Sequence, residues 1–562
     1  MNTLDYIVIV IFCLIVLIAG LAFGKQGKDM KSFFAAGGNV PWQINGIALF
    51  MSFFSAGTFV VWGSIAYQYG LVAVAIQWTM CIGGFLIGMF IAPRWKNARI
   101  LTAGEFIGQR LGKKVQQYYT YLILFLSLGY TGAFLYPVAK ILNVSSGISI
   151  NFSIIALGLG VILYTAVGGL WAVVITDVLQ FVILMAAVII VVPLAFEKAG
   201  GVTAFVENAP ANFFDIVNAE YSGWFLFAFA VYNMIFIGGN WAYVQRYTTV
   251  KTTKDARKVG YLFSFLYVIS PIVWMLPPMI YRVVGQDLAG LENEGAYLLM
   301  CKMVLPVGML GLMLGGMIFA TASSVNTTLN LVAAVFTNDI YKNIRPDASQ
   351  KQLMKIARMT TVVFGLATIV VALLVPAAGG IVEVVLTIGA VTGCSIYGPP
   401  IWALFSKVHT GRSIWACTVI SLSINLLFKF ITPIWPGISL NRPEEMLLGA
   451  LLPFTLLGVY ELYARQTSRS KEQYFAYQAT QQQKTEDDEV GESAEQNRYG
   501  IRVMAITLSI IGVLIIGLGI ISKTAVVLVT VVGCGILVVA AWLFKIGMVR
   551  TSRRVLESSS KV

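Results

Sequence analysis

The segment ATASSVNTTLNLVAAVFTNDIYK, residues 320–342, places a row of hydroxyl and amide side chains inside an otherwise apolar helix. One face of this helix carries residues spaced by three and four positions, namely Ala320, Ser323, Ser324 and Thr327. Each hydroxyl could bond back to a carbonyl of its own helix and serve only packing. Together with carbonyls freed by a broken helix, the same hydroxyls would offer neutral oxygen ligands, which suit a hard monovalent cation. The remaining sequence helps to decide between helix packing and cation binding.

The composition is that of a membrane protein. Apolar residues make up 58% of the 562 residues, charged residues only 12%, and the mean hydropathy is +0.80. A soluble domain is nearer one quarter charged, and apolar runs of about 20 residues recur along this chain. We therefore predict an all-α polytopic membrane protein with about fifteen transmembrane helices. The predicted spans are residues 5–23, 42–66, 70–92, 116–144, 151–167, 170–195, 223–244, 259–283, 305–336, 355–376, 381–405, 412–434, 446–463, 501–522 and 524–546.

The net charge of +13 follows the predicted topology. With the N-terminus outside and the C-terminus in the cytoplasm, 32 of the 39 Lys and Arg residues fall on the inner side. This is the positive-inside pattern of a multi-pass protein, here expected in the inner (plasma) membrane of a bacterium. The basic charge therefore indicates orientation, and we expect no nucleic-acid partner. The oligomeric state stays open.

The chain divides into five predicted parts. Residues 466–500 are polar, Gln-rich and partly acidic, which is typical of a flexible linker, here a cytoplasmic one. The two helices after it are almost purely aliphatic and predict a peripheral addition. The parts are an N-terminal extra helix and inner loop (1–40), a ten-helix inverted-repeat transport core (41–410), additional helices (411–465), the linker (466–500), and two C-terminal helices with a basic cytoplasmic tail (501–562).

Two predicted helices contain breaking residues at corresponding places. The second span mixes Ser52, Ser55, Gly57 and Thr58 into an apolar run, and the seventh contains NMIFIGGNW, residues 233–241. Interrupted helices in two halves of a chain indicate a transporter binding site, and a spacing of five spans suits two inverted five-helix repeats. Ordinary packing of small residues remains the alternative.

Asp177 is the one carboxylate well inside a predicted span. A charge there is expensive and marks an ion path by default. We find no Lys or Arg at the same predicted depth, so a cation from solution is the expected partner, with a protonated structural Asp as the alternative. Six scattered cysteines and the single His409 form no zinc-site or catalytic pattern, so we do not expect an enzyme.

Four segments resemble the sodium:solute symporter family, which contains bacterial and animal sodium/glucose cotransporters. They are the opening segment together with MKSFFAAGGNVPWQINGIALFMSFFSAGTF (30–59), TAVGGLWAVVITDVLQ (165–180) and NWAYVQRYTTVKTTKDARK (240–258). The likeness covers about residues 1–460. It implies a LeuT-like fold, with a 5+5 inverted repeat and extra N- and C-terminal helices, that works by alternating access.

The resemblance also implies ion and substrate residues. The main sodium site would use carbonyls of Met51, Phe54 and Ala320 and the hydroxyls of Ser323 and Ser324. Some relatives bind a second sodium with an acid matching Asp177, a serine matching Ser323 and two more serines, which here are Asn326 and Thr327. At the sugar-binding positions this chain has Thr58, Gln77 and Tyr267, with Phe236 in place of a gating Tyr, and it keeps only Asn233.

These departures argue against a hexose bound in the usual way. A carboxylate substrate would also lack its usual Arg partner near the midplane. We therefore expect a sodium-coupled symporter that imports a small neutral polar solute, sugar- or polyol-like, with Na⁺ as the coupling ion. Two alternatives stay open: a proton-coupled carrier on the same fold that uses Asp177, and a transporter-like membrane sensor.

Overall fold

The structure is a computed structural model that describes residues 1–21, 40–100, 102–375, 381–435, 437–466, 471–482, 490–522 and 525–559. Within these ranges all regular structure is helical, which confirms the all-α prediction.

The helices of the first half of the chain are α1 (Thr3–Leu21), α3 (Trp42–Phe53), η2 (Thr58–Trp62), α4 (Gly63–Tyr69), α5 (Val72–Leu86), η3 (Ile87–Ile91), α6 (Ala92–Asn97), α7 (Ala103–Leu111), α8 (Lys113–Ser146), α9 (Ile150–Lys198), α10 (Val202–Glu207), α11 (Gly223–Gly239), α12 (Trp241–Thr248) and α13 (Thr253–Val284). Those of the second half are η4 (Gly290–Gly295), α14 (Ala296–Val304), α15 (Met309–Val335), η5 (Phe336–Tyr341), α16 (Lys342–Ile344), α17 (Gln350–Leu374), α18 (Ile381–Ala403), α19 (Gly411–Leu426), η7 (Leu427–Ile431), α20 (Arg442–Gln466), α21 (Glu472–Gln482), α22 (Val490–Ser522) and α23 (Val526–Ser559).

The described residues contain 11 helices long and apolar enough to cross a membrane, or 13 spans when each of two bent helix pairs counts as one. Two shorter apolar helices, Thr3–Ile15 and Ile150–Leu163, lie where the first and fifth spans are predicted. The fifth and sixth predicted spans share one helical element, α9, in which the side chains of residues 164 and 166–175 lie outside the described part of the chain. The total of fifteen stays a prediction.

Both predicted helix interruptions are present. The first bends the chain by 57° between α3 and the helix of residues 58–69, and the second bends it by 63° between α11 and α12. At the first break Phe54 has extended backbone angles (φ −101°, ψ 102°), and the backbone N–H of Ala56 donates to Thr321 Oγ1 at 2.9 Å. At the second, Asn240 is extended and its Oδ1 accepts from the N–H of Ala242 at 3.0 Å. Side chains therefore satisfy backbone groups that the breaks release, as a membrane interior requires.

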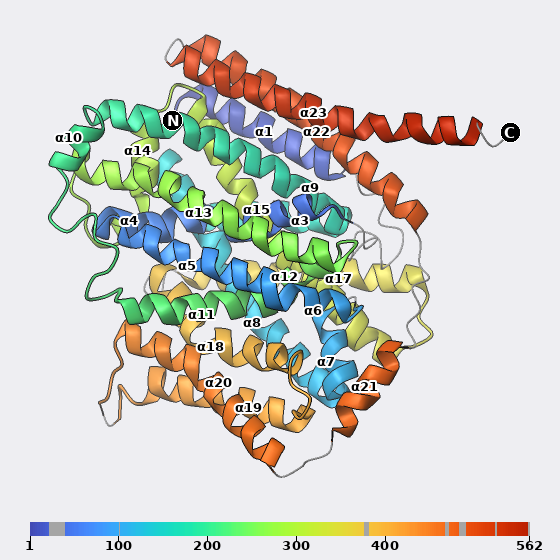
Figure 1. Ribbon diagram of the computed structural model, residues 1–562. Helices are drawn as coiled ribbons and strands as arrows, with labels where there is room; N and C mark the ends of the chain where they lie inside the picture. The colour runs from blue at the N-terminus through green and yellow to red at the C-terminus, as the bar shows by residue number, and fades with distance from the viewer. Residues whose placement is uncertain are drawn as a thin grey trace.

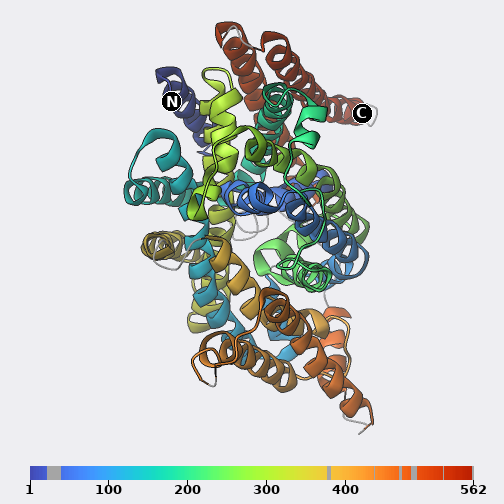
Figure 2. The same ribbon diagram turned by 90° about the vertical axis from the view of Figure 1, so that its left-hand side faces the viewer.

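The helices form three groups across the molecule (Figure 1). At one edge, α22 and α23 pack against each other and share a separate apolar core with α1, α9 and α15. At the opposite edge lie α18, α19 and α20, and the two broken helix pairs lie between the edges (Figure 2). The segment predicted as a flexible linker contains the helix α21, which packs against α7.

One backbone contact holds two neighbouring helices closely together. A Cβ added to Gly260 of α13 would lie 2.6 Å from the Cα of Gly88 in η3, so these backbones touch. Such close approach is the usual role of small residues between membrane helices.

The start of α15 is capped from the far end of the chain. Asp5 of α1 is 3% exposed, and its Oδ1 accepts hydrogen bonds from the N–H groups of Gly308 at 2.9 Å and Gly311 at 3.2 Å. No side chain at the N-cap position of α15 itself provides a cap. A carboxylate at a helix N-terminus also opposes the positive end of the helix dipole.

Candidate functional site

The hydroxyl face of α15 lies against the first helix break. The Ser324 hydroxyl is 3.4 Å from the carbonyl oxygen of Ser52 in α3 and 3.4 Å from that of Ala320 one turn back. Ser324 and Thr321 are 3% and 1% exposed. Both Ser324 contacts are long for hydrogen bonds, so the hydroxyl is only weakly engaged by protein oxygens. Three neutral oxygens thus converge at the break.

The residues implied as sodium ligands lie in this region. Met51, Phe54 and Ala320 are completely buried, and the carbonyl of Met51 accepts from the N–H of Phe54 at 3.1 Å. The side chain of Ser323 lies outside the described residues. The carbonyl of Ser52 was not anticipated, although its place between two implied ligands in the interrupted segment could have indicated it.

The expectation that Asp177 has no protein cation at its depth is wrong. Arg246 Nη2 lies 3.2 Å from Asp177 Oδ2, and their side chains are 1% and 0% exposed. The same nitrogen lies 3.5 Å from Thr327 Oγ1. The predicted seventh span ends at residue 244, which puts Arg246 in the inner loop that follows. In the structure the break at Asn240 starts a new helix, α12, and Arg246 is among its buried residues. A guanidinium therefore lies between the predicted acid and one of its predicted co-ligands.

Three buried amides lie on the same two helices as Arg246 and Thr327, namely α12 and α15. Asn326 and Asn330 are each 1% exposed and Gln245 is 3% exposed. Within the described part of the chain, neither side-chain oxygen nor nitrogen of these three residues has a hydrogen-bond partner. A buried polar group without a partner costs about 1–3 kcal/mol. These amides are therefore suited to contact with water or with a passing ion.

A cavity of about 110 Å³ lies between the two helix breaks. Its walls come from α3, η2, α5, α8, α11, α12 and α18, and carry Ser52, Phe53, Ser55, Gly57, Thr58, Val61, Trp62, Met80, Tyr130, Ala133, Phe134, Pro137, Phe229, Tyr232, Asn233, Phe236, Tyr243, Val385 and Ile388. Of the predicted substrate residues, Thr58, Asn233 and Phe236 line it. Gln77 and Tyr267 do not.

The two displaced residues are held elsewhere in the core. The Tyr267 ring packs against Phe50 and Phe263, with centroids 5.1 and 4.8 Å apart, and Tyr267 is 1% exposed. Gln77 is 2% exposed within α5. Neither position can contact a solute in this cavity without rearrangement.

The cavity offers a few polar atoms on an aromatic wall. Asn233 Nδ2 donates to Thr79 Oγ1 at 2.8 Å, while Asn233 Oδ1 is buried with no partner among the described residues. The rings of Tyr232 and Phe236 stack at 5.4 Å, and the hydroxyl of Tyr130 lies 3.0 Å from Thr392 Oγ1. Sequence reasoning missed Tyr130 and Tyr232, which stand in aromatic-rich spans with no local signal. An apolar pocket with few convergent polar groups is typical of small-molecule sites.

Comparison with known proteins agrees with this architecture. Residues 33–416 match the sodium:solute symporter family. A sodium/glucose cotransporter of Vibrio parahaemolyticus is 28% identical over 505 residues, which cover 82% of this chain and 91% of that protein. A sodium/sialic acid symporter of Proteus mirabilis is 25% identical over 386 residues, covering 65% of this chain and 76% of that protein.

The fold also matches a solved structure. The substrate-bound outward-open state of a Na⁺-coupled sialic acid symporter superposes with a TM-score of 0.72 at 21% identity, covering 82% of this chain and 98% of that one. The fold is therefore LeuT-like, as predicted. The chain is a multi-pass membrane transporter rather than an enzyme, and it belongs to the sodium:solute symporter family.

Proposed function

We propose that this protein is a sodium-coupled symporter that imports a small neutral polar solute, sugar- or polyol-like, by alternating access. One observation carries the proposal: the last turn of α3, at the first helix break, contributes to both candidate sites. Ser52 lines the cavity, and its carbonyl lies 3.4 Å from the Ser324 hydroxyl on α15. An ion held between α3 and α15 would fix this segment, and with it one wall of the solute site.

The chemistry of the cavity supports a neutral solute. All of its lining residues are uncharged, and the polar groups Thr58, Asn233 and Tyr130 can form hydrogen bonds to hydroxyls. The rings of Phe229, Tyr232 and Phe236 form a stacked aromatic wall, with successive centroids 5.4 Å apart, which suits the apolar face of a sugar or polyol. The curated relatives include transporters named for glucose and sialic acid.

We further propose one sodium ion per cycle. The resemblance implies a second sodium ion near Asp177, Asn326 and Thr327. The guanidinium of Arg246 lies beside Asp177 and Thr327 and would supply the positive charge in its place. The same pair disfavours the proton-coupled alternative, because protonation of Asp177 would leave Arg246 as an uncompensated buried charge. Inward movement of one sodium ion would gain about 2.3 kcal/mol per 100 mV of membrane potential, in addition to its concentration gradient.

The first test is sodium binding to the purified protein, followed by its thermal unfolding in sodium and in potassium. We expect sodium to raise the unfolding temperature of the wild type, and Ser324→Ala to weaken apparent sodium affinity about tenfold or more. Thr328→Val is the matched control, since the Thr328 hydroxyl donates to its own helix at Ser324 O (3.2 Å).

Solutes are then identified by reciprocal coupling. A transported solute should raise sodium affinity by the same factor by which sodium raises solute affinity. We would screen sugars and polyols for this shift and measure uptake of the hits in proteoliposomes with an imposed sodium gradient. Uptake that persists without sodium and follows a proton gradient would overturn the proposal. So would equal effects of the Ser324 and Thr328 substitutions on sodium affinity.

A further inference from the structure

A second cavity lies far from the transport site, where α8 and α19 begin and α21 returns to the core. Its volume is about 950 Å³, and it opens to the surface on the side predicted to be cytoplasmic. Its lining comprises Leu111, Gly112, Lys113, Lys114, Val115, Val408, Thr410, Gly411, Arg412, Ser413, Tyr460, Glu472 and Gln473. We refer to it as the basic recess. The proposed transport function makes no use of it.

Three cations converge on the basic recess. Lys113 and Lys114 are the first residues of α8, and Arg412 is the second residue of α19. All three are exposed, and none has an ion pair with another residue in the ranges that the structure describes. Glu472 also lines the recess, but it has an interaction of its own. The recess is therefore a local excess of positive charge beyond the general bias of an inner surface.

The backbone reinforces this charge. Gly112, at the N-cap of α8, has φ +103° and supplies no side-chain cap. The positive end of the dipole of this 34-residue helix thus faces the same recess as the two lysines.

Aromatic residues place the recess at the membrane surface. Tyr118 of α8 and Trp415 of α19 stack with ring centroids 5.1 Å apart, one turn into each helix from the cations. Tyr118 is 47% exposed, and further along the same helix Phe125 is 73% exposed. Tyr and Trp at this position mark the headgroup level, with exposed apolar side chains toward the hydrocarbon. These residues therefore predict that the recess lies at the depth of lipid phosphates.

We propose that the basic recess binds the phosphate of an anionic phospholipid headgroup, with Lys113, Lys114 and Arg412 as its ligands. The bound headgroup would join the beginnings of α8 and α19. It would also support α21, which already contacts this region because the N–H of Gly411 donates to Gln473 Oε1 at 3.2 Å. Juxtamembrane basic clusters attract anionic lipids in this way. The inference does not depend on the identity of the transported solute or ion.

The test compares lipid binding to the purified full-length chain by native mass spectrometry, with phosphatidylglycerol and phosphatidylcholine of equal acyl composition as probes. We expect the wild type to retain phosphatidylglycerol preferentially. The triple variant K113Q/K114Q/R412Q should lose this preference, with affinity falling about fivefold for each cation removed. The variant should fold normally, because all three side chains are exposed, and its thermal unfolding in detergent would verify this.

The control variant K351Q/K355Q/R358Q removes three exposed cations from α17, on the same predicted side of the membrane. It should keep the wild-type preference. Equal losses in both triple variants would show that total charge alone attracts the lipid, and would overturn the proposal. A wild type without any preference would also overturn it. Displacement of the lipid by millimolar inorganic phosphate would reassign the recess to soluble anions and would refute a lipid site.

Discussion

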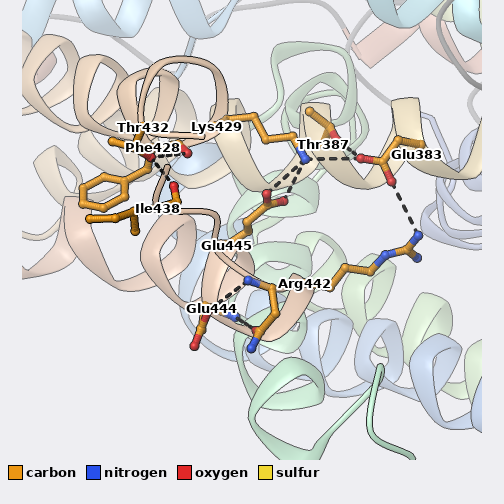
Figure 3. A network of polar contacts seen from close by, with 10 residues as sticks. Glu383, Thr387, Phe428, Lys429, Thr432, Ile438, Arg442, Glu444 and Glu445 are labelled. Carbon is orange, nitrogen blue, oxygen red and sulfur yellow. Dashed lines mark hydrogen bonds and ion pairs between the residues drawn. The ribbon is translucent and has the colours of Figure 1, made fainter. Parts of the chain in front are cut away.

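Ion pairs occur in two contrasting settings in this molecule. Asp177 and Arg246 form a single pair at the predicted inner side, with side chains 0% and 1% exposed. At the predicted outer side, Lys429 contacts Glu383 at 3.2 Å and Glu445 at 3.0 Å, and these three side chains are 20–48% exposed (Figure 3). The ion pair at the predicted inner side is thus buried, whereas the ion pairs at the predicted outer side are partly exposed to solvent.

The difference has an energetic meaning. Separating a buried pair leaves a charge with no water to solvate it, whereas an exposed pair exchanges its contacts for water at little cost. The outer network links α18, η7 and α20, and Arg442 extends it to Glu220 at 3.0 Å. Its bonds can therefore rearrange easily. Separation of the inner pair, by contrast, carries the full cost of leaving both charges buried.

The largest effect should come from breaking the buried pair on one side only. Arg246→Gln takes the guanidinium away from the buried Asp177 carboxylate, which should lower stability by about 3–5 kcal/mol. The thermal unfolding temperature of the purified protein would measure this loss. Adding Asp177→Asn removes the carboxylate charge, so the double variant should recover most of the stability. A double variant as unstable as the single one would show that the pair itself is not the source of the effect.

Breaking the exposed network should have a much smaller effect. Lys429→Gln removes two contacts with carboxylates, and we expect a loss of about 0.2–1 kcal/mol for each at low salt. The difference in unfolding temperature between variant and wild type should shrink as salt is raised, because exposed charges are screened. A loss as large as that of Arg246→Gln, or one indifferent to salt, would remove the contrast between the two sides.

We expect the smallest effect on stability from His409. It is buried like the inner ion pair, but its nearest carboxylate, that of Glu461, is not in close contact. Its ring nitrogens contact Ser413 Oγ at 3.0 Å and the carbonyl of Leu457 at 3.1 Å, and Glu461 Oε2 is 4.0 Å away. Burial lowers the pKa of His409, and nearby Arg110 adds to this, while the Leu457 carbonyl and Glu461 partly oppose it.

A lowered pKa makes the folded state resist protonation. The unfolded chain takes up a proton on this histidine near pH 6.5, whereas the folded chain does so only at lower pH. The free energy of unfolding should therefore decrease progressively as the pH falls below 6.5. The fall in unfolding temperature between pH 7.5 and 5.5 should therefore be smaller in His409→Gln than in the wild type. An identical fall in both proteins would assign the acid sensitivity to other groups.

Features that depend on a local pattern of residues could be predicted from the sequence. The two interruptions were predictable because Gly, Ser and Asn break an apolar pattern locally. The hydroxyl face of α15 was predictable because helical spacing places Ser324 and Thr327 together. Both inferences needed only the residues of one segment and the spacing of side chains along a helix.

The expectation about Asp177 failed because its partner depends on the path of the chain in space. Arg246 follows an apolar span by only a few residues, and only the 63° bend at Asn240 makes it a partner of Asp177. Gln77 and Tyr267 stay predictions: they lie on spans that contribute to the core, but they do not line the cavity, and their contact with a solute would depend on how each helix is rotated. No local pattern encodes a bend angle or a helix rotation.

The cap that Asp5 places on α15 has a consequence for biosynthesis. Gly308, which donates to this carboxylate, lies 303 residues further along the chain. At about 5–20 residues per second, roughly 15–60 s separate the synthesis of the two partners. During that interval α1 is already in the membrane, but the Asp5 carboxylate cannot yet accept its hydrogen bonds from Gly308 and Gly311. The helix that carries the hydroxyl row thus completes its N-terminus by docking on a segment inserted much earlier, so this contact cannot form before about half of the chain has been made.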